Sequence, residues 1–247
     1  LHHVSPFALG FLAPLVAGIP IILPHSMTGP QLARALNEGE ATAILGIPRL
    51  YTALFTAIRR RMASGGRAAT ATFDGLLTAT AKVRDLTGLD PGRLLFKPVR
   101  NRFAPRLRLL ISGGAALDLT LGRQLDALGW RIATGYGLTE TSPILTMMPP
   151  GVRRFGSAGY ALAGVQLRIA EREDERADGE VQAKGPNVFA GWLDLPDKTR
   201  EAFTDDGWFR TGDLGLLDDG YLYIKGRLKN VIVGPSGENI YPEEIEA

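Results

Sequence analysis

Cysteine is the one residue type that this 247-residue sequence lacks altogether. Without cysteine there is no disulfide bond, no thiolate nucleophile and no cysteine-based metal site. This absence fits a cytoplasmic protein, which is the location we expect. Long apolar runs are missing too, because Gly10, Pro14, Gly18 and Pro20 interrupt the most apolar stretch, residues 7–24. A membrane-spanning helix needs about 20 consecutive apolar residues, so this stretch predicts a buried helix followed by a buried strand.

A strong charge of either sign is also missing, since 28 Lys or Arg and 26 Asp or Glu give a net charge of +2. So small a balance does not favour nucleic acid as a partner. The basic residues are uneven, however, with eight Lys or Arg and two Asp in residues 82–108. We interpret this segment as a solvated helical face. The alternative is that the segment forms a surface that binds an anionic group, such as a nucleotide phosphate or a lipid headgroup. This segment and the three arginines at residues 59–61 are also compatible with peripheral membrane contact.

Helix and strand patterns alternate through the first 150 residues. Predicted helices cover residues 31–37, 48–62, 73–87, 92–103 and 119–128, and predicted strands cover residues 18–24, 41–46, 107–112 and 131–136. Strands that are separated by helices pair in parallel through right-handed crossovers. We therefore predict an α/β domain at residues 1–150, built on part of a parallel sheet flanked by helices.

The segments after residue 150 are short and punctuated by turn residues. Apolar and polar residues alternate at 165–170 and 179–184, and Asp219-Gly220 is typical of a hairpin turn. We predict a small antiparallel β subdomain at residues 151–225. Residues 226–247 restart a strand and end as a helix begins, and we predict that they form a hinge and the start of a C-terminal domain.

Four short stretches follow a strand or lie at a predicted boundary, where open α/β sheets gather ligands. They are residues 112–116 (SGGAA), 136–143 (YGLTETSP), 208–215 (WFRTGDLG) and 226–230 (GRLKN). In the second stretch Tyr136 could stack on a base, and Thr139 could donate a hydrogen bond to a phosphate oxygen. Glu140 could hold Mg²⁺, which prefers oxygen ligands and is often shared with substrate phosphates.

The other stretches have an ordinary structural interpretation beside the functional one. The two glycines of SGGAA are typical of a simple turn between a strand and a helix. The carboxylate of Asp213 could bond its own backbone in a turn, or could accept both hydroxyls of a ribose. The basic pair of GRLKN could be surface charge, or a hinge from which Arg227 reaches a nucleotide.

In this order and spacing, the four stretches resemble the adenylate-forming superfamily, which includes acyl-CoA synthetases, luciferases and peptide-synthetase adenylation domains. The resemblance covers nearly the whole chain. Within the superfamily, the chain is most similar to bacterial long-chain fatty acyl-CoA synthetases. Three stretches carry this similarity: residues 46–51, the helical insert before residues 107–114, and residues 236–246.

The resemblance implies a two-step reaction. A carboxylic acid attacks the α-phosphate of ATP to give acyl-AMP and pyrophosphate, and the thiol of CoA then displaces AMP.

By resemblance, the nucleotide contacts residues from several of these stretches. Gly114 and Ala115 line the adenine pocket, and Tyr136 stacks on the ring. Asp213 holds the ribose hydroxyls, and Arg227 helps to hold the ribose or a phosphate. Gly113 and Gly137 complete the implied nucleotide-binding set.

The resemblance also implies which residues act in the reaction. Thr139 contacts the α-phosphate, and Glu140 binds Mg²⁺. Lys229 matches the hinge about which the family's small C-terminal domain swings between the two half-reactions. His3 matches a position near the carboxylate of the acyl substrate, with His2 as a competing candidate.

Two elements of the family pattern are not found in this sequence. We expect the Ser/Thr/Gly-rich phosphate loop, which ends in a lysine, before Leu1, and the domain with the adenylating lysine after Glu246. We therefore expect a central section of a longer enzyme that has no synthetase activity alone. Two alternatives stay open. One is an enzyme for aryl or medium-chain acids or for loading a carrier protein, and the other is a non-catalytic nucleotide-binding remnant.

Overall fold

The computed structural model describes most of the chain. The residues that it describes are 3–171 and 178–230, with the backbone alone at 232–233 and 239–240. Contacts divide the chain into two units. Unit 1 comprises residues 1–133 and 149–155, and unit 2 comprises residues 134–148 and 156–247. The three predicted domains, with boundaries at residues 150 and 225, stay predictions.

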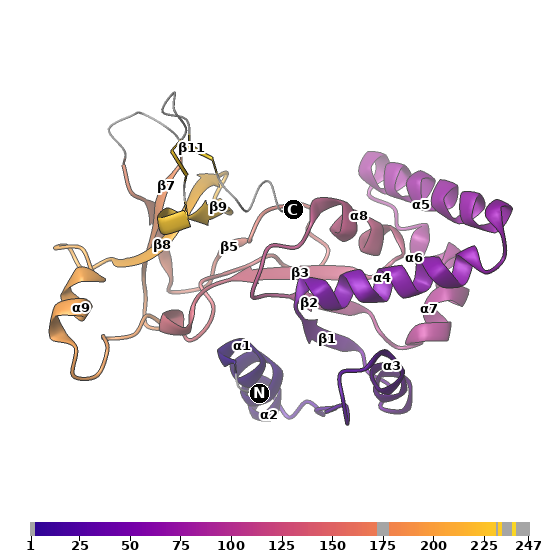
Figure 1. Cartoon of the computed structure of the whole chain (residues 1–247), viewed down its shortest axis with the longest axis horizontal. Helices are drawn as coiled ribbons and strands as arrows, with labels where there is room; N and C mark the ends of the chain where they lie inside the picture. Colours follow the sequence, from indigo (N-terminus) through magenta and orange to yellow (C-terminus); the bar gives the residue numbers. More distant parts are fainter. Residues whose placement is uncertain (1–2, 172–177, 231, 234–238, 241–247) are drawn as a thin grey trace. The chain divides into compact units, whose positions relative to one another are not determined.

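Unit 1 alternates helices and strands, and this confirms the predicted α/β class (Figure 1). Its helices are α1 (Val4–Phe7), the π-helical turn η1 (Ala8–Leu12), α2 (Ala13–Val16), α3 (Gly29–Glu38), α4 (Pro48–Ala63), α5 (Arg67–Thr87), α6 (Gly92–Leu95), α7 (Lys97–Phe103) and α8 (Leu119–Ala127). Its strands are β1 (Ala43–Gly46), β2 (Leu109–Ser112) and the first half of β3 (Arg131–Tyr136), which continues into unit 2.

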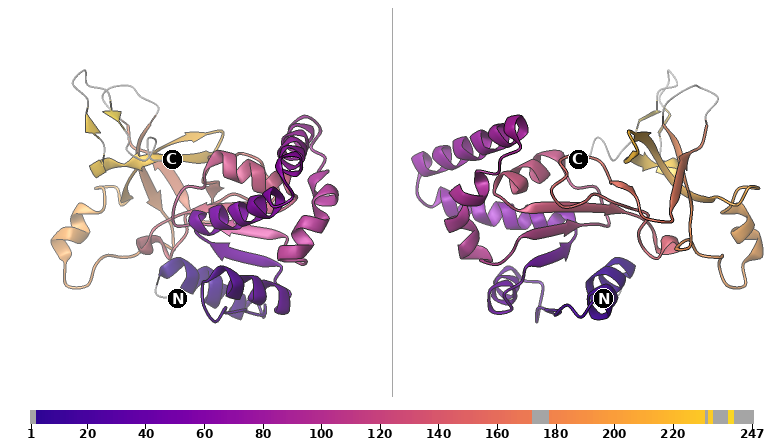
Figure 2. Two further views of the ribbon diagram at one scale, coloured as in Figure 1. Left: turned by 45° about the vertical axis from the view of Figure 1, so that its right-hand side comes forward. Right: turned by 180° about the vertical axis from the view of Figure 1, so that it is seen from behind.

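The strands of unit 1 form the parallel pair that the helical crossovers predict. β1 pairs with β2 in parallel, with Ala43 opposite Leu109. The amide of Arg131 donates to the carbonyl of Arg108 at 2.9 Å, so β3 begins beside β2. α3 and α5 lie on opposite sides of β1 and β2 (Figure 1 and Figure 2). The sheet of unit 1 is thus covered by helices on both sides.

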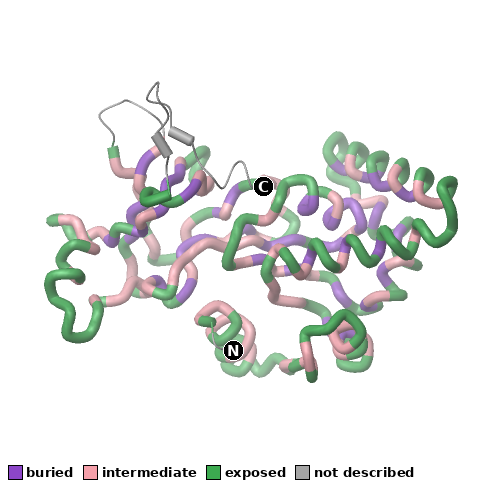
Figure 3. The backbone as a smooth tube through the Cα atoms, in the orientation of Figure 1, coloured by how far each residue is buried: buried purple, intermediate pink, exposed green. Residues whose placement is uncertain are grey.

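The helices of unit 1 pack through regularly spaced apolar residues. α4 buries Tyr51, Phe55 and Ile58, which are three or four positions apart and therefore lie on one face. α5 repeats this spacing with Phe73 and Leu77. The buried stripes of both helices are visible in Figure 3. This spacing explains why the two helices were predictable from the sequence.

Tyr51 connects α4 to both strands of the parallel pair. The single hydrogen of its hydroxyl is shared between two carbonyl oxygens, that of Ile111 at 2.6 Å and that of Ile44 at 3.1 Å. Burial raises the pKa of this phenol above its ordinary value. The hydroxyl therefore stays protonated and satisfies two carbonyl groups inside the core.

The basic segment at residues 82–108 is only partly the solvated face that we predicted. Arg84 is buried, and its guanidinium pairs with Asp90 at 3.0 Å and with Asp126 at 3.1 Å. Arg100 is also buried and donates to backbone carbonyls, including that of Arg93 at 2.6 Å. The prediction is wrong for these two arginines, because acceptors from other elements replace water around them.

Residues 7–24 differ from the prediction in two ways. The helical part is present in α1, η1 and α2, but it is not buried, since Val16 is 87% exposed. Residues 18–24 form no strand, and Leu23 is 63% exposed. Pro20 and Pro24 have no amide hydrogen to donate to a neighbouring strand. Among the described residues, no helix is long and apolar enough to span a membrane.

Unit 2 is the antiparallel β part of the chain. Its strands are the second half of β3, β4 (Thr146–Met147), β5 (Tyr160–Ala161), β6 (Gln166–Ile169), β7 (Gly179–Lys184), β8 (Phe209–Asp218), β9 (Tyr221–Arg227), β10 (Ile232–Val233) and β11 (Asn239–Ile240). Its helical segments are η2 (Thr139–Thr141), α9 (Pro196–Glu201) and η3 (Leu228–Asn230). β3, β4 and β5 pair antiparallel, as do β6 to β9 in that order. The predicted antiparallel β fold of this part of the chain is confirmed, while the bounds of the subdomain stay a prediction.

The hairpin predicted at Asp219-Gly220 joins β8 and β9. Both turn residues have positive φ angles, 50° and 77°, as a tight two-residue turn requires. The sheet has its own core, in which Val181, Leu214 and Leu222 are fully buried. β8 is thereby held between β7 and β9.

Candidate nucleotide site

The C-terminal end of β3 and the middle of β8 bring two predicted site residues together. The hydroxyl of Tyr136 donates to Oδ2 of Asp213 at 2.8 Å, across 77 positions of sequence. Asp213 is 5% exposed, so its carboxylate lies inside unit 2. A buried carboxylate needs hydrogen-bond donors or a counter-charge to stay ionised. Tyr136 provides one such donor.

Arg227 provides the counter-charge. It lies opposite Asp213 in the β8–β9 ladder, and its Nε is 3.0 Å from Oδ1. The Arg227 side chain is half exposed, with 52% of its surface accessible. The arginine therefore reaches from the buried carboxylate towards the surface. Three residues that the sequence analysis assigned to a nucleotide form one connected group.

Thr211 fixes the backbone beneath this group, and the sequence analysis missed it. Its hydroxyl donates to the carbonyl oxygen of Val181 at 2.7 Å and accepts the amide of Asp213 at 3.1 Å. This links β7 to β8 at the carboxylate. Its partner is a backbone carbonyl 30 positions away, so no local pattern in the sequence indicated the contact.

The pKa of Tyr136 is raised well above its ordinary value. Burial is the main cause, and the negative charge of Asp213 adds to it. The phenol therefore stays protonated at neutral pH and acts as a donor to the carboxylate.

The loop after β3 holds its own shape through local contacts. The hydroxyl of Thr141 accepts the amide of Leu138 at 2.8 Å and donates to the carbonyl oxygen of the same residue at 3.0 Å. Gly137 is required by space, since a Cβ there would lie 2.2 Å from the carbonyl oxygen of Pro143. The loop carries the two residues predicted to meet phosphate and metal.

Those two side chains are free to bind a ligand. Within the described part of the chain, neither the Thr139 hydroxyl nor the Glu140 carboxylate has a hydrogen-bond or ion-pair partner. Thr139 is exposed and Glu140 is half-buried. No cluster of three or more His, Asp or Glu that could hold a metal is present among the described residues. Glu140 stays the predicted magnesium ligand, and magnesium in proteins usually takes several of its oxygen ligands from substrate phosphates and water.

Asn187 also contacts this loop, and sequence reasoning missed it. Its side-chain amide donates to the carbonyl oxygens of Thr141 at 3.0 Å and Ile144 at 2.7 Å. Nothing in the local pattern Gly-Pro-Asn indicated more than a turn, because the partners lie more than 40 positions away and are backbone atoms.

Unit 1 contains the glycine-rich stretch. Gly113 donates its amide to the carbonyl oxygen of Gly46 at 3.2 Å, next to the end of the β1–β2 pair. Gly114 has a φ of 81°, which explains the need for glycine there. Gly114 and Ala115 are exposed. Their roles in adenine binding stay predictions.

His3 and Lys229 also keep untested roles. His3 is exposed and is the N-cap of α1, where its Nδ1 accepts the amide of Ser5 at 3.3 Å. This is an ordinary helix cap, and the predicted contact with the acyl carboxylate stays a prediction. His2 lies outside the described residues. Lys229 is exposed on η3, directly after β9.

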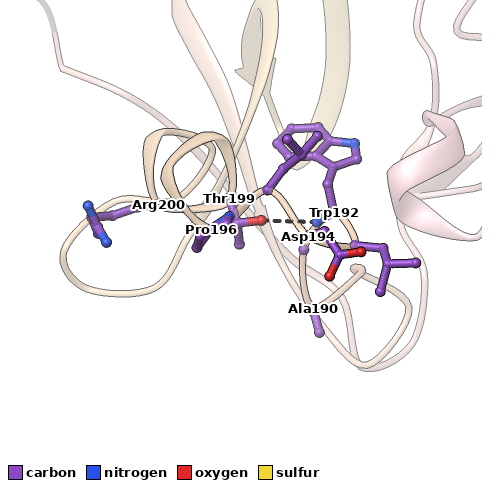
Figure 4. A pocket seen from close by; sticks show the side chains of 9 residues that line it. Ala190, Trp192, Asp194, Pro196, Thr199 and Arg200 are labelled. Atoms are coloured by element: carbon purple, nitrogen blue, oxygen red, sulfur yellow. Dashed lines mark hydrogen bonds between the residues drawn. The ribbon is translucent and has the colours of Figure 1, made fainter.

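A surface pocket of about 700 Å³ lies elsewhere in unit 2, between β7 and α9 in sequence (Figure 4). Its lining is Ala190, Gly191, Trp192, Leu193, Asp194, Leu195, Pro196, Thr199 and Arg200. The amide of Trp192 donates to the hydroxyl of Thr199 at 3.0 Å and closes the loop (Figure 4). None of the predicted site residues lines this pocket.

Comparison with known proteins decides the family. Residues 1–193 match the family described as AMP-binding enzyme. The chain belongs to this AMP-binding enzyme family. The resemblance found in the sequence motifs is thereby confirmed.

The chain is 34% identical to the long-chain-fatty-acid–CoA ligase FadD15 of Mycobacterium bovis, over 83% of the chain and 35% of that protein. It is 32% identical to the long-chain-fatty-acid–CoA ligase ACSBG1 of Bos taurus, over 90% of the chain and 32% of that protein. The chain therefore spans about a third of the length of these curated relatives.

Solved structures show the same fold. The chain superposes with a TM-score of 0.72 on the O-succinylbenzoate coenzyme A synthetase of Bacillus subtilis in complex with ATP and magnesium, at 25% identity over 99% of this chain and 43% of that one. ATP-bound MatB from Rhodopseudomonas palustris superposes with a TM-score of 0.71 at 29% identity, over 99% of this chain and 42% of that one.

Proposed function

We propose that this chain forms the nucleotide-binding part of a ligase that activates a carboxylic acid with ATP. The acid would become an acyl-AMP and would then pass to CoA, with a long-chain fatty acid as the preferred substrate. The observation that carries the proposal is the connected group of Tyr136, Asp213 and Arg227. It supports the proposal because it joins a buried acceptor, a flat aromatic ring and a cation that extends to the surface.

The chemistry of these residues suits the nucleoside and its phosphate. The Asp213 carboxylate accepts the hydroxyls of the ribose, and the ring of Tyr136 stacks on the base. Arg227 donates to the ribose or to a phosphate. Thr139 donates its free hydroxyl to the α-phosphate, where the acid attacks.

Glu140 would hold magnesium. When bound, the ion neutralises negative charge on the phosphates and so favours attack by an anionic carboxylate. The protein forms no covalent bond to the substrate in this scheme. It aligns the reactants and places fixed charges around the reacting phosphate.

The remaining residues keep the roles that the family resemblance implies. We assign the backbone of Gly113, Gly114 and Ala115 to the adenine and His3 to the carboxylate of the acid. Lys229 would be the hinge between the two half-reactions. Relatives named as long-chain-fatty-acid–CoA ligases support the choice of fatty acid and of CoA.

Acid-dependent exchange of pyrophosphate into ATP, measured on the full-length protein, tests the proposal. We expect exchange with palmitate, and we expect Asp213→Asn to lower its kcat/KM by about tenfold to a hundredfold. Hydrogen bonds to a charged group are worth about 1.5–3 kcal/mol, and about 1.4 kcal/mol corresponds to tenfold. Asp206→Asn is the matched control, because Asp206 pairs with Arg168 on the exposed surface of the same unit.

The outcome also separates the alternatives. Exchange that is absent with every acid would contradict the proposal and favour a non-catalytic nucleotide-binding protein. Exchange that prefers an aryl acid would favour the second candidate, a ligase for aryl acids. That candidate is supported by the structural similarity to an O-succinylbenzoate coenzyme A synthetase.

A further inference from the structure

Asn187 reaches the loop of Thr139 and Glu140 with both of its amide hydrogens. One N–H donates to the carbonyl oxygen of Thr141 and the other to that of Ile144, at 3.0 and 2.7 Å. A side-chain amide has only two such donors. Asn187 therefore uses its whole donor capacity on the backbone of this one loop.

A second contact from the same segment strengthens the attachment. The amide of Phe189 donates to the carbonyl oxygen of Glu140 at 2.8 Å. The Phe189 ring in turn packs against Trp192, Phe203 and Phe209, with ring centroids 4.9 to 5.8 Å apart. Residues 187–189 thus connect the loop to an aromatic cluster of unit 2.

The other end of the Asn187 side chain indicates that this arrangement has a cost. Its Oδ1 is buried and has no hydrogen-bond partner in the part of the chain that the structure describes. A buried acceptor without a donor disfavours folding. An apolar residue would avoid that cost but would leave the carbonyl oxygens of Thr141 and Ile144 without this donor, so the asparagine serves to hold the loop.

We propose that Asn187 is a positioning residue for the phosphate and metal groups of the site. Its amide fixes the backbone on the C-terminal side of Glu140, and Phe189 fixes the carbonyl of Glu140 itself. Among the described residues, the side chains of Thr139 and Glu140 have no partner, so their orientation depends on this backbone. The inference rests on the proposed function, because it needs Mg²⁺ and ATP as the ligands.

The variant Asn187→Leu tests this, because leucine is similar in size and has no donor. In the pyrophosphate-exchange assay on the full-length protein, we expect the KM for Mg·ATP to rise about tenfold or more, as residues that orient metal ligands typically do. The inhibition constant of adenosine should stay within about twofold, since adenosine lacks the phosphates that Thr139 and Glu140 address. Neither constant depends on how much of the protein is folded.

Asn37 offers a matched control. Its amide makes the same pair of bonds in unit 1, to the carbonyl oxygens of Ala33 at 2.8 Å and Phe103 at 2.7 Å. Asn37→Leu should leave both constants unchanged. Asn187→Ser, which keeps one polar group, should fall between the wild type and Asn187→Leu, and it serves where the leucine variant does not fold.

Each outcome decides the inference. An equal rise in both constants, an unchanged KM for Mg·ATP in the Asn187 variants, or the same effect from Asn37→Leu would overturn the positioning role and leave the proposed function standing. Absence of acid-dependent exchange in the wild type would overturn the proposed function, and this inference with it.

Discussion

At the scale of single residues, the site depends on a hydrogen bond between two groups that burial alone would disfavour. Tyr136 and Asp213 are both polar, and Asp213 is almost fully buried. Their 2.8 Å contact satisfies the phenol and one carboxylate oxygen together. Removing one partner costs more than the bond itself contributes, because the other stays buried without its donor.

Tyr136→Phe is therefore expected to destabilise the protein by about 1–3 kcal/mol at neutral pH. It should also change how stability depends on alkaline pH. The pKa of Tyr136 is raised in the folded state, so above about pH 10 the unfolded chain releases this proton first. The unfolded state then binds fewer protons than the folded state, and stability falls as pH rises.

Urea unfolding at pH 8 and pH 10.5 measures this effect. The loss of stability between the two pH values should be smaller in Tyr136→Phe than in the wild type. Tyr160→Phe is the control, because Tyr160 is 45% exposed. An equal loss in the wild type and Tyr136→Phe would contradict the assigned role of Tyr136.

Residue chemistry also explains which site residues were predictable. Tyr136 and Asp213 lie in short, unusual runs of aromatic, hydroxyl and acidic residues that indicate a ligand. Asn187 and Thr211 act on backbone carbonyls of other segments. Any residue type has a carbonyl, so no side-chain pattern marks the partner and only the folded chain shows the contact.

At the scale of elements, α5 and α8 are joined by a buried group of charges. Asp126 on α8 pairs with Arg84 on α5 at 3.1 Å and with Arg153 at 2.9 Å. Arg153 also pairs with Asp85 of α5 at 2.7 Å. Burial raises the pKa of Asp126, although both arginines oppose this shift. Removing the Asp126 carboxylate from water is thus a large cost, and its ion pairs with Arg84 and Arg153 offset that cost.

Asp126→Ala should destabilise unit 1 by about 3–5 kcal/mol, because it leaves Arg84 buried with less compensating charge. Thermal and urea unfolding measure the change. Glu38→Ala is the control, since the Arg34–Glu38 pair of α3 is about two-thirds exposed and such pairs contribute about 0–1 kcal/mol. A loss no greater than that of the control would mean that the charges are not coupled.

Element types followed from the sequence wherever one periodicity dominated. The apolar spacing of α4 and the alternation of β7 have one interpretation each, and both elements are present. Residues 18–24 are apolar but have no periodicity, and their prolines cannot donate to a ladder. Hydrophobicity alone therefore led to a strand that does not form.

At the scale of the whole molecule, similarity in sequence and similarity in structure point to different acids. The curated relatives at 32–34% identity are long-chain-fatty-acid–CoA ligases. A solved structure at 25% identity is an O-succinylbenzoate coenzyme A synthetase. The fold and the nucleotide motifs are common to the family, so they do not distinguish between the acids. The choice of acid must be measured.

The preferred acid can be identified by measuring acyl-CoA formation by the full-length protein with a series of acids from octanoate to palmitate. Each buried methylene is worth about 0.8 kcal/mol, so kcat/KM for acyl-CoA formation should rise about fourfold per methylene until the acyl pocket is filled. Asp213→Asn should lower every rate by a similar factor and keep the order of preference, because it acts on the nucleotide. A flat series, or faster turnover of o-succinylbenzoate than of palmitate, would contradict the assignment to long-chain fatty acids and favour an aryl-acid ligase.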